Sequence, residues 1–184
     1  SDSIEVDEAT YPLLIEERRV ALDSMGFGQW NGAPATQGSY RSLTGDLTVY
    51  YCGDGGTFAP KGVLGGKAGG HCGTWKRHRS GKLERLPDFH TETVSGKEAI
   101  HFRSCAGGGY GSPRRRDPGR VLADINRQWL SAATARKIFG VAVKLAPNGV
   151  DYLLDEKRTA VLRKASSNIS PQAKGRKIAA KTGS

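Results

Sequence analysis

The chain has 184 residues, of which 37% are hydrophobic and 8% aromatic, with 25 glycines and a formal net charge of +10. This length allows one domain, or one domain with a tail, and the apolar supply is low for a self-sufficient globule. No apolar stretch approaches the roughly 18 residues of a membrane span, no signal peptide opens the chain, and three cysteines fit a reducing cytoplasm better than a disulfide framework.

The first part of the chain favours extended structure interrupted by glycine. Residues 11–20 mix apolar and charged side chains in a pattern suited to a strand, with Pro12 at its start or on a sheet edge. Residues 23–38 are rich in glycine and turn formers. We expect Phe27 and Trp30 to anchor this second stretch against the core.

Strands and glycine loops continue through the middle of the chain. Alternating hydrophobic residues predict strand structure over residues 41–52, with a turn at Gly45-Asp46. Residues 53–73 hold nine glycines in 21 residues, too many for a regular element. A hairpin is predicted over residues 74–86, where Ser80-Gly81-Lys82 supplies the turn.

Residues 96–105 are predicted to form a further strand, which runs into a glycine loop. This loop consists of Gly107, Gly108, Gly109, Tyr110, Gly111, Ser112 and Pro113. Glycine lacks a Cβ, so the loop can adopt positive φ, which we expect at Gly109, and can pack closely on a neighbour. The sequence therefore predicts a structural loop that docks against other segments.

Two helices are predicted to follow the glycine loop. Asp117 is expected to cap the first, over residues 117–130, with Pro118 at its first position. Ser131 is expected to cap the second, which stops at Gly140.

A hairpin and a last helix complete the predicted elements. Pro147-Asn148-Gly149 is a strong turn signal between strands at residues 141–145 and 150–154. Asp155 is expected to cap a final helix that extends to about Lys164.

These elements predict an α+β fold, in which a β-rich, glycine-loop-rich first two thirds precedes two short helices, a β-hairpin and a final helix. Residues 1–165 are expected to form a single domain, and residues 166–184 a basic, disordered tail. No carboxylate side chain follows Glu156, whereas eight basic ones do. This asymmetry suggests a polyanionic partner or an acidic partner surface, and a solvated basic tail explains it equally well.

Potential metal ligands occur without a compact motif. A zinc site could be assembled from distant loops by Cys52, Cys72 and Cys105 with one histidine, for which His71 is a candidate. The sequence contains no Cys-x-x-Cys, and His71 and Cys72 are adjacent, a spacing that rarely lets both bind one ion. Buried free thiols are the favoured interpretation.

Other chemistry is weakly signalled. The glycine loop could bind a phosphate, but it lacks a Gly-Lys-Ser/Thr ending, and Asp117 would repel an anion. We find no nucleophile elbow and no convincing carboxylate pair, since Asp124 shares its helix with the capping Asp117, so no catalytic residue is expected. Residues 75–79 and 114–116, with Tyr110, could contact RNA, but without an RNP motif nucleic acid is not the favoured partner.

The order of motifs resembles the C-terminal end of hydantoinase B/5-oxoprolinase-type subunits, which are related to the large subunits of acetone and acetophenone carboxylases. The resemblance covers about residues 9–154. The matching blocks are Tyr11-Pro12-Leu13, residues 26–32, 61–69, 107–118, 121–125, 131–135 and 139–143. The family usually has Asp where Ser112 stands and an acidic residue near Arg115, so the glycine loop has lost negative charge.

The resemblance implies a small, non-catalytic subunit that completes a hydantoinase-B-like body beside larger hydantoinase-A-like and hydantoinase-B-like subunits. It carries over no catalytic residue, because the family's metal- and substrate-binding Asp and His residues lie in a preceding part. The expected complex is cytoplasmic, is not bound to a membrane, and uses ATP with Mg²⁺ or Mn²⁺, Zn²⁺ being a further candidate. An acetophenone-carboxylase-like ketone carboxylase is the first choice. The alternatives are a hydantoinase, oxoprolinase or lactamase system and, from another class, a stand-alone basic nucleic-acid-binding module.

Overall fold

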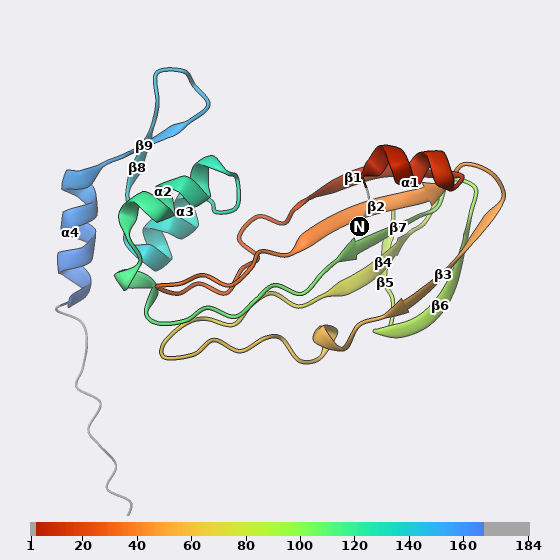
Figure 1. The fold of residues 1–184 in the computed structure, drawn as a ribbon, viewed down its shortest axis with the longest axis horizontal. Helices are drawn as coiled ribbons and strands as arrows, with labels where there is room; N and C mark the ends of the chain where they lie inside the picture. Colours follow the sequence, from red (N-terminus) through yellow and green to blue (C-terminus); the bar gives the residue numbers. More distant parts are fainter. Residues whose placement is uncertain (1–2, 168–184) are drawn as a thin grey trace, which may run out of the picture.

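The computed structural model describes residues 3–167, in which a sheet end and a helical end are joined by long glycine-rich segments (Figure 1). The strands are β1 (Leu13–Val20), β2 (Thr36–Ser42), β3 (Asp46–Cys52), β4 (Gly73–Arg77), β5 (Leu83–Arg85), β6 (Phe89–Ser95), β7 (Ala99–Arg103), β8 (Val143–Leu145) and β9 (Tyr152–Leu154). The helices are α1 (Ile4–Thr10), α2 (Pro118–Asn126), α3 (Ala132–Thr134) and α4 (Glu156–Ser167), with short 3₁₀ turns η1 (Asp54–Gly56) and η2 (Pro113–Arg115) and a π-helical turn η3 (Ala135–Phe139). The predicted α+β fold is confirmed.

The sheet end has two β layers. Five strands form an antiparallel sheet in the order β1-β2-β7-β4-β5, and β3 pairs with β6 as a separate ribbon. The ribbon packs across the sheet because its alternate residues are apolar. The shared core consists of Leu86, Val94 and Ile100, against which Tyr40, Leu47 and Val49 pack. Helix α1 lies over β1 at the outer edge (Figure 1).

The helical end has its own core, to which the glycine-rich part of the chain contributes one aromatic ring. The buried cluster consists of Val121, Ile125, Leu130, Ala135, Phe139 and Val141. Phe27 packs edge-on against Phe139, with ring centroids 5.6 Å apart and an interplanar angle of 77°. This contact confirms the prediction that Phe27 anchors its stretch of chain to the core.

Local turn and cap signals were accurate guides to the elements. Asp117 caps α2 by accepting a hydrogen bond from the Arg120 amide, and Ser131 caps α3 in the same way. Gly140 ends η3 in the left-handed conformation, with φ of 64°. The β4–β5 and β8–β9 hairpins turn where they were predicted to turn.

Three expectations were wrong or incomplete. Helix α1 and strand β6 were not predicted, and β2 begins at Thr36, inside the stretch expected to be turns. Trp30 is not a core anchor, because half of its surface is exposed. Helix α4 runs to Ser167, and residues 168–184 of the predicted tail lie outside the described residues. Between residues 3 and 167, no helix is long and apolar enough to cross a membrane.

A charged cluster on the sheet makes the stability of the sheet end depend on pH. Burial raises the pKa of the Glu16 carboxyl, but hydrogen bonds from Arg77 and Ser39 and the charges of Arg77 and Arg41 outweigh burial, so the pKa lies below its usual value. The Arg77 Nη2 to Glu16 Oε2 distance is 2.7 Å. A lowered carboxyl pKa stabilises the fold above the unfolded pKa of about 4.3, and this stabilisation is lost as the pH falls through the folded pKa.

We therefore expect Glu16→Gln to lower the free energy of unfolding at pH 7 by no more than about 1 kcal/mol, because the ion pair is partly exposed. Below about pH 4 the difference from the wild type should shrink. Urea unfolding at pH 7 and pH 3 measures both values. Arg77→Gln should reduce the pH dependence as well, and an unchanged difference at pH 3 would contradict this assignment.

Candidate docking interface

Three glycine-rich segments run side by side between the sheet end and the helical end (Figure 1). They comprise residues 24–33, 60–70 and 105–111, and we call them the glycine bundle. Backbone hydrogen bonds connect the segments: the Gly26 amide donates to the Gly107 carbonyl at 2.8 Å, and the Gly109 amide donates to the Lys67 carbonyl at 2.9 Å. The segments therefore bind one another mainly through main-chain groups.

Close backbone approach explains why glycine is required in this bundle. A Cβ added at Gly109 would lie 2.5 Å from the Phe27 carbonyl oxygen and 2.6 Å from that of Gly26. The glycines at which an added Cβ would lie closer than 3.0 Å to the backbone of another segment are Gly26, Gly28, Gly32, Gly66, Gly69, Gly107, Gly108 and Gly109. The expected positive φ at Gly109 is wrong, because within the predicted loop only Gly111 adopts one, at 72°.

The same hydrogen bonds argue against phosphate binding by the predicted loop. The amide of Gly107 donates to the Ala33 carbonyl, and the amide of Gly111 donates to the Val63 carbonyl. The amide of Gly109 is bonded within the bundle as well. Main-chain donors that already serve the fold cannot also bind an anion. Of the remaining loop residues, Gly108 packs on the 60–70 segment, Tyr110 is half exposed, and Pro113 is buried at η2.

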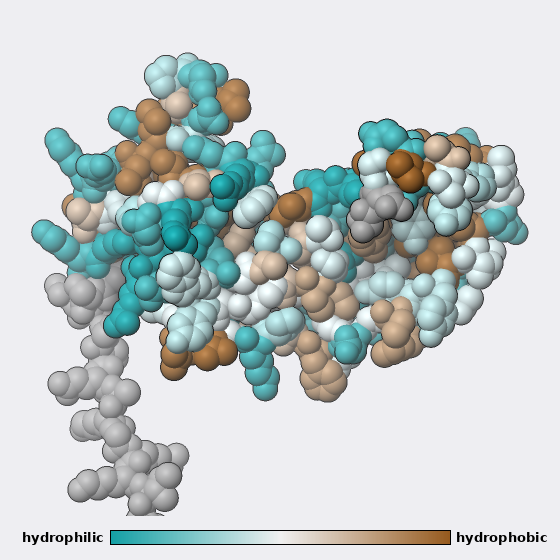
Figure 2. Space-filling model, in the orientation of Figure 1, coloured by the Kyte–Doolittle hydropathy of each residue, from teal (hydrophilic) through white to brown (hydrophobic). Residues whose placement is uncertain are grey.

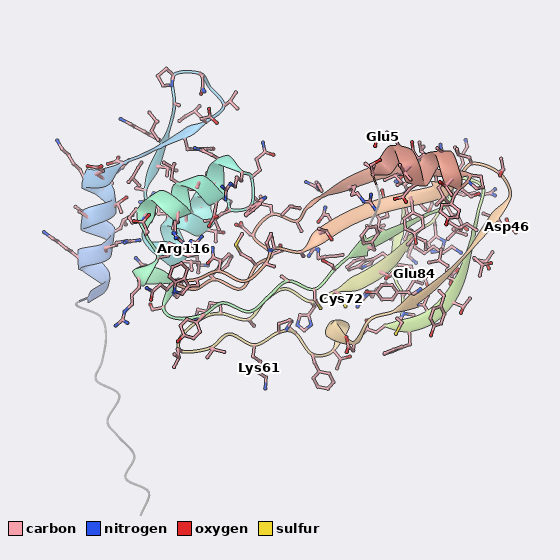
Figure 3. All side chains as sticks on the ribbon, in the orientation of Figure 1. Glu5, Asp46, Lys61, Cys72, Glu84 and Arg116 are labelled. Carbon is pink, nitrogen blue, oxygen red and sulfur yellow. The ribbon has the colours of Figure 1, made fainter. Side chains whose placement is uncertain are left out.

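A buried polar network attaches the glycine bundle to helix α2. The Arg116 guanidinium donates to Asp124 Oδ2 at 2.8 Å and to the Gln29 carbonyl at 3.2 Å. The same Asp124 oxygen accepts a hydrogen bond from Asn31 Nδ2, and Asn31 Oδ1 accepts one from the Gly28 amide. Arg116 and Asp124 are 8% and 5% exposed, so this ion pair is shielded from water. Figure 3 shows Arg116 at the junction of the helical end and the bundle.

Sequence reasoning identified Arg116 and Asp124 only as parts of other motifs. The available signal was the position of Asp124, which lies on the same face of α2 as the buried Val121 and Ile125. A carboxylate on a buried face requires a cation or hydrogen-bond donors. Asp23 makes a second link, because its carboxylate accepts hydrogen bonds from the amide and hydroxyl of Ser131.

The predicted zinc ligands do not come together as a set. An added Cβ at Gly55 would collide with the Cys105 sulfur and lie 3.5 Å from the Cys72 sulfur, so these two thiols are neighbours. Cys52 is exposed, and His71 is exposed with its Nδ1 2.9 Å from the Gly56 carbonyl. Across residues 3–167, no group of three or more His, Cys, Asp or Glu side chains could hold a metal ion.

The thiols should differ in reactivity because their surroundings differ. Cys52 is exposed and Cys72 is buried, while burial and a hydrogen bond with Cys72 raise the pKa of the Cys105 thiol. Since the thiolate is the reactive form, we expect iodoacetamide at neutral pH to label Cys52 first. Intact mass should show one fast adduct in the native protein and three in urea. Fast labelling of Cys105 in the native protein would contradict this prediction.

The basic residues considered for RNA binding contact groups of this chain. Lys76 pairs with Glu92 at 2.8 Å, and Arg77 pairs with Glu16. Arg114 donates to the carbonyls of Leu162 and Lys137, and Arg116 is buried in the polar network. These cations are therefore committed to contacts within the fold.

A groove of about 540 Å³ lies between the α3–η3 segment, β8 and α4. Its lining consists of Ala132, Ala133, Arg136, Val141, Ala142, Val143, Lys157, Arg158, Val161 and Leu162. The lining is apolar with three cations and no carboxylate. It gives the helical end an exposed surface suited to contact with another macromolecule or segment.

Comparison with known proteins identifies a family pattern. The family model for hydantoinase B/oxoprolinase matches residues 1–113. The chain is 31% identical over 160 residues to the uncharacterised protein MJ0963 of Methanocaldococcus jannaschii, covering 87% of this chain and 28% of that protein. It is 31% identical over 147 residues to the caprolactamase beta subunit of Pseudomonas jessenii, covering 78% of this chain and 25% of that protein.

The hydantoinase-B-type subunit of a putative D-/L-hydantoinase from Pseudomonas sp. strain NS671 is 28% identical over 172 residues, covering 89% of this chain and 27% of that protein. Among solved structures, the ATP-dependent caprolactamase of Pseudomonas jessenii matches with a TM-score of 0.71 and 27% identity over 89% of this chain and 28% of that chain. Nucleotide-free acetone carboxylase matches with a TM-score of 0.72 and 20% identity, over 91% of this chain and 26% of that chain. At that identity it shows a shared fold. The chain thus spans about a quarter of the length of its relatives.

Proposed function

The chain belongs to the hydantoinase B/oxoprolinase family, and from this membership we propose that it is a non-catalytic part of an ATP-dependent carboxylase or cyclic amide hydrolase. In this proposal it completes a hydantoinase-B-like body and assembles with larger hydantoinase-A-like and hydantoinase-B-like chains. The glycine bundle is the observation that supports this role, because its interlocked backbone gives a rigid surface for assembly.

We assign ATP and its Mg²⁺ or Mn²⁺ to the larger chains of the complex. The donor groups of residues 3–167 do not fit a divalent metal, since no three potential ligands cluster there. The role of this chain is therefore architectural, and no step of the reaction is assigned to its side chains.

Two reactions are candidates for the complex. Cyclic amide hydrolysis is supported by the two relatives with informative names, the caprolactamase and the putative D-/L-hydantoinase. ATP-dependent carboxylation of a ketone, with an acetophenone-carboxylase-like enzyme as the specific hypothesis, is supported by the order of the sequence motifs and by the fold shared with acetone carboxylase.

Native mass spectrometry of the protein, purified gently from its source at moderate salt, tests the assembly. We expect it to co-purify with larger hydantoinase-A-like and hydantoinase-B-like chains. ATP consumption is then measured with caprolactam or hydantoin, and separately with acetophenone and bicarbonate, to distinguish the two reactions. A lone monomer, or a protein bound to nucleic acid that dissociates as salt rises, would contradict the proposal.

A further inference from the structure

Three side chains from neighbouring segments form a row on one face of the glycine bundle. Trp30 makes an antiparallel bridge with Tyr110, and Tyr110 makes a parallel bridge with Val63. Residues paired in this way project their side chains to the same face. Leu64 follows Val63 directly in the chain. We call these four residues the bundle patch.

The bundle patch is exposed. Trp30 and Tyr110 are each 50% exposed, Val63 is 54% exposed, and Leu64 is 71% exposed. Figure 2 shows hydrophobic side chains at the lower edge of the molecule, below the helical end, where the 57–72 loop turns back in Figure 1. Single exposed apolar residues are ordinary on a protein surface, whereas an adjoining set indicates an interaction site.

The backbone of Leu64 adopts an uncommon conformation. Its φ is +50°, in the left-handed region that a branched aliphatic residue rarely adopts. Burial within this chain does not compensate for the strain, because most of the Leu64 surface is in solvent. Strained residues held in place by surrounding structure occur often at binding sites. The turn therefore presents an apolar side chain outward at a conformational cost.

The bundle holds the patch rigidly. The Val63 amide donates to the Gly109 carbonyl at 2.9 Å, and Trp30 and Tyr110 exchange backbone hydrogen bonds of 3.0 and 2.8 Å. A surface that is already ordered loses little conformational entropy on binding. The Arg120 guanidinium lies 4.7 Å from the centre of the Trp30 ring, which places a positive charge beside the patch. Exposed Lys61 lies on the same loop (Figure 3).

We propose that the bundle patch is the surface by which this chain docks onto the larger hydantoinase-B-like chain, at an apolar hollow bordered by carboxylates. The inference rests on the proposed function. This chain matches 25–28% of the length of its curated relatives, so the matching part of each relative belongs to a protein about four times as large. Trp, Tyr and Arg dominate binding energy at protein interfaces, and all three occur here. Aliphatic Val63 and Leu64 offer no donor to a phosphate, so the patch fits protein better than nucleic acid.

Variants at Leu64 separate docking from folding. Leu64→Gly should leave the thermal unfolding midpoint of the chain unchanged or raised, because glycine accepts the left-handed backbone. It should nevertheless weaken binding to the larger hydantoinase-B-like chain at least about tenfold, and Leu64→Asp should weaken it further. A purely structural role for Leu64 would lower stability and affinity together. Val150→Asp is the matched control, because Val150 is 73% exposed at the tip of the β8–β9 hairpin.

The measurement is a binding titration of the full 184-residue chain with the larger chain that co-purifies with the wild type. If Leu64→Asp and Val150→Asp bind equally well, the patch is not the interface, although the proposed function stands. If the Leu64 variants abolish only self-association, the occupant is a second copy, and the inference is overturned. A wild-type chain that binds no larger chain overturns both this inference and the proposed function.

Discussion

Replacing Gly109 with valine is expected to lower the free energy of unfolding by more than about 3 kcal/mol, at the high end of overpacking effects. The first added atom would lie 2.5 Å from the Phe27 carbonyl oxygen, and main-chain atoms there cannot move aside as a flexible side chain can. Moving that segment would also break the Lys67 amide to Phe27 carbonyl bond of 2.7 Å. Urea unfolding followed by circular dichroism measures the loss. Assembly with the larger chains should fail in parallel.

Gly119→Ala is the matched control for this prediction. Gly119 lies in the first turn of α2, where an added Cβ would meet only the Asp117 carboxylate, at 3.0 Å. Alanine is also the better helix former, so stability should stay the same or rise. Normal stability and normal assembly of the Gly109→Val protein would show that close packing of the glycine bundle is not required for either.

Replacing Asp124 with alanine should cost roughly 3–5 kcal/mol, the usual penalty for removing one partner of a buried ion pair. The Arg116 guanidinium would remain buried without its carboxylate, and Asn31 would lose its acceptor. The damage should extend from α2 into the glycine bundle, because Asn31 also accepts from the Gly28 amide. Chemical unfolding at pH 7 gives the loss of stability.

Asp117→Ala is the comparison, since Asp117 caps the same helix from an exposed position. Loss of this cap should cost about 1 kcal/mol. The double variant Arg116→Met with Asp124→Leu should regain most of the stability lost by Asp124→Ala, because no uncompensated charge stays buried. A double variant as unstable as the single one would show that the network contributes through its shape rather than through the charge pair.

Features decided within a few residues could be predicted from the sequence. The caps at Asp117 and Ser131 and the turn at residues 147–149 depend on neighbours in the chain, and each appears where the local pattern placed it. Strand β6 depends on β3, in a register that pairs Asp46 with Ser95, so no local signal determines it. Its sequence also alternates too few apolar residues to mark a strand by itself.

The candidate interface was only partly predictable for the same reason. Glycine density indicated that the loops pack closely, but not which segment each glycine meets, and the expectation of positive φ at Gly109 was wrong. The Asn31–Asp124 hydrogen bond joins residues 93 positions apart. The predicted separation of Trp30 from solvent failed because its ring lies beside Tyr110 on an outer face.

The glycine bundle also constrains the order in which this protein can fold. Its central hydrogen bond joins Gly26 to Gly107, and its third segment ends at residue 111. Contacts between such distant residues require closure of long loops and form slowly. During synthesis, the first segment must wait until the third has left the ribosome, with its main-chain donors and acceptors unpaired. A chaperone or a partner chain that shields residues 24–33 during this interval would raise the yield of folded protein.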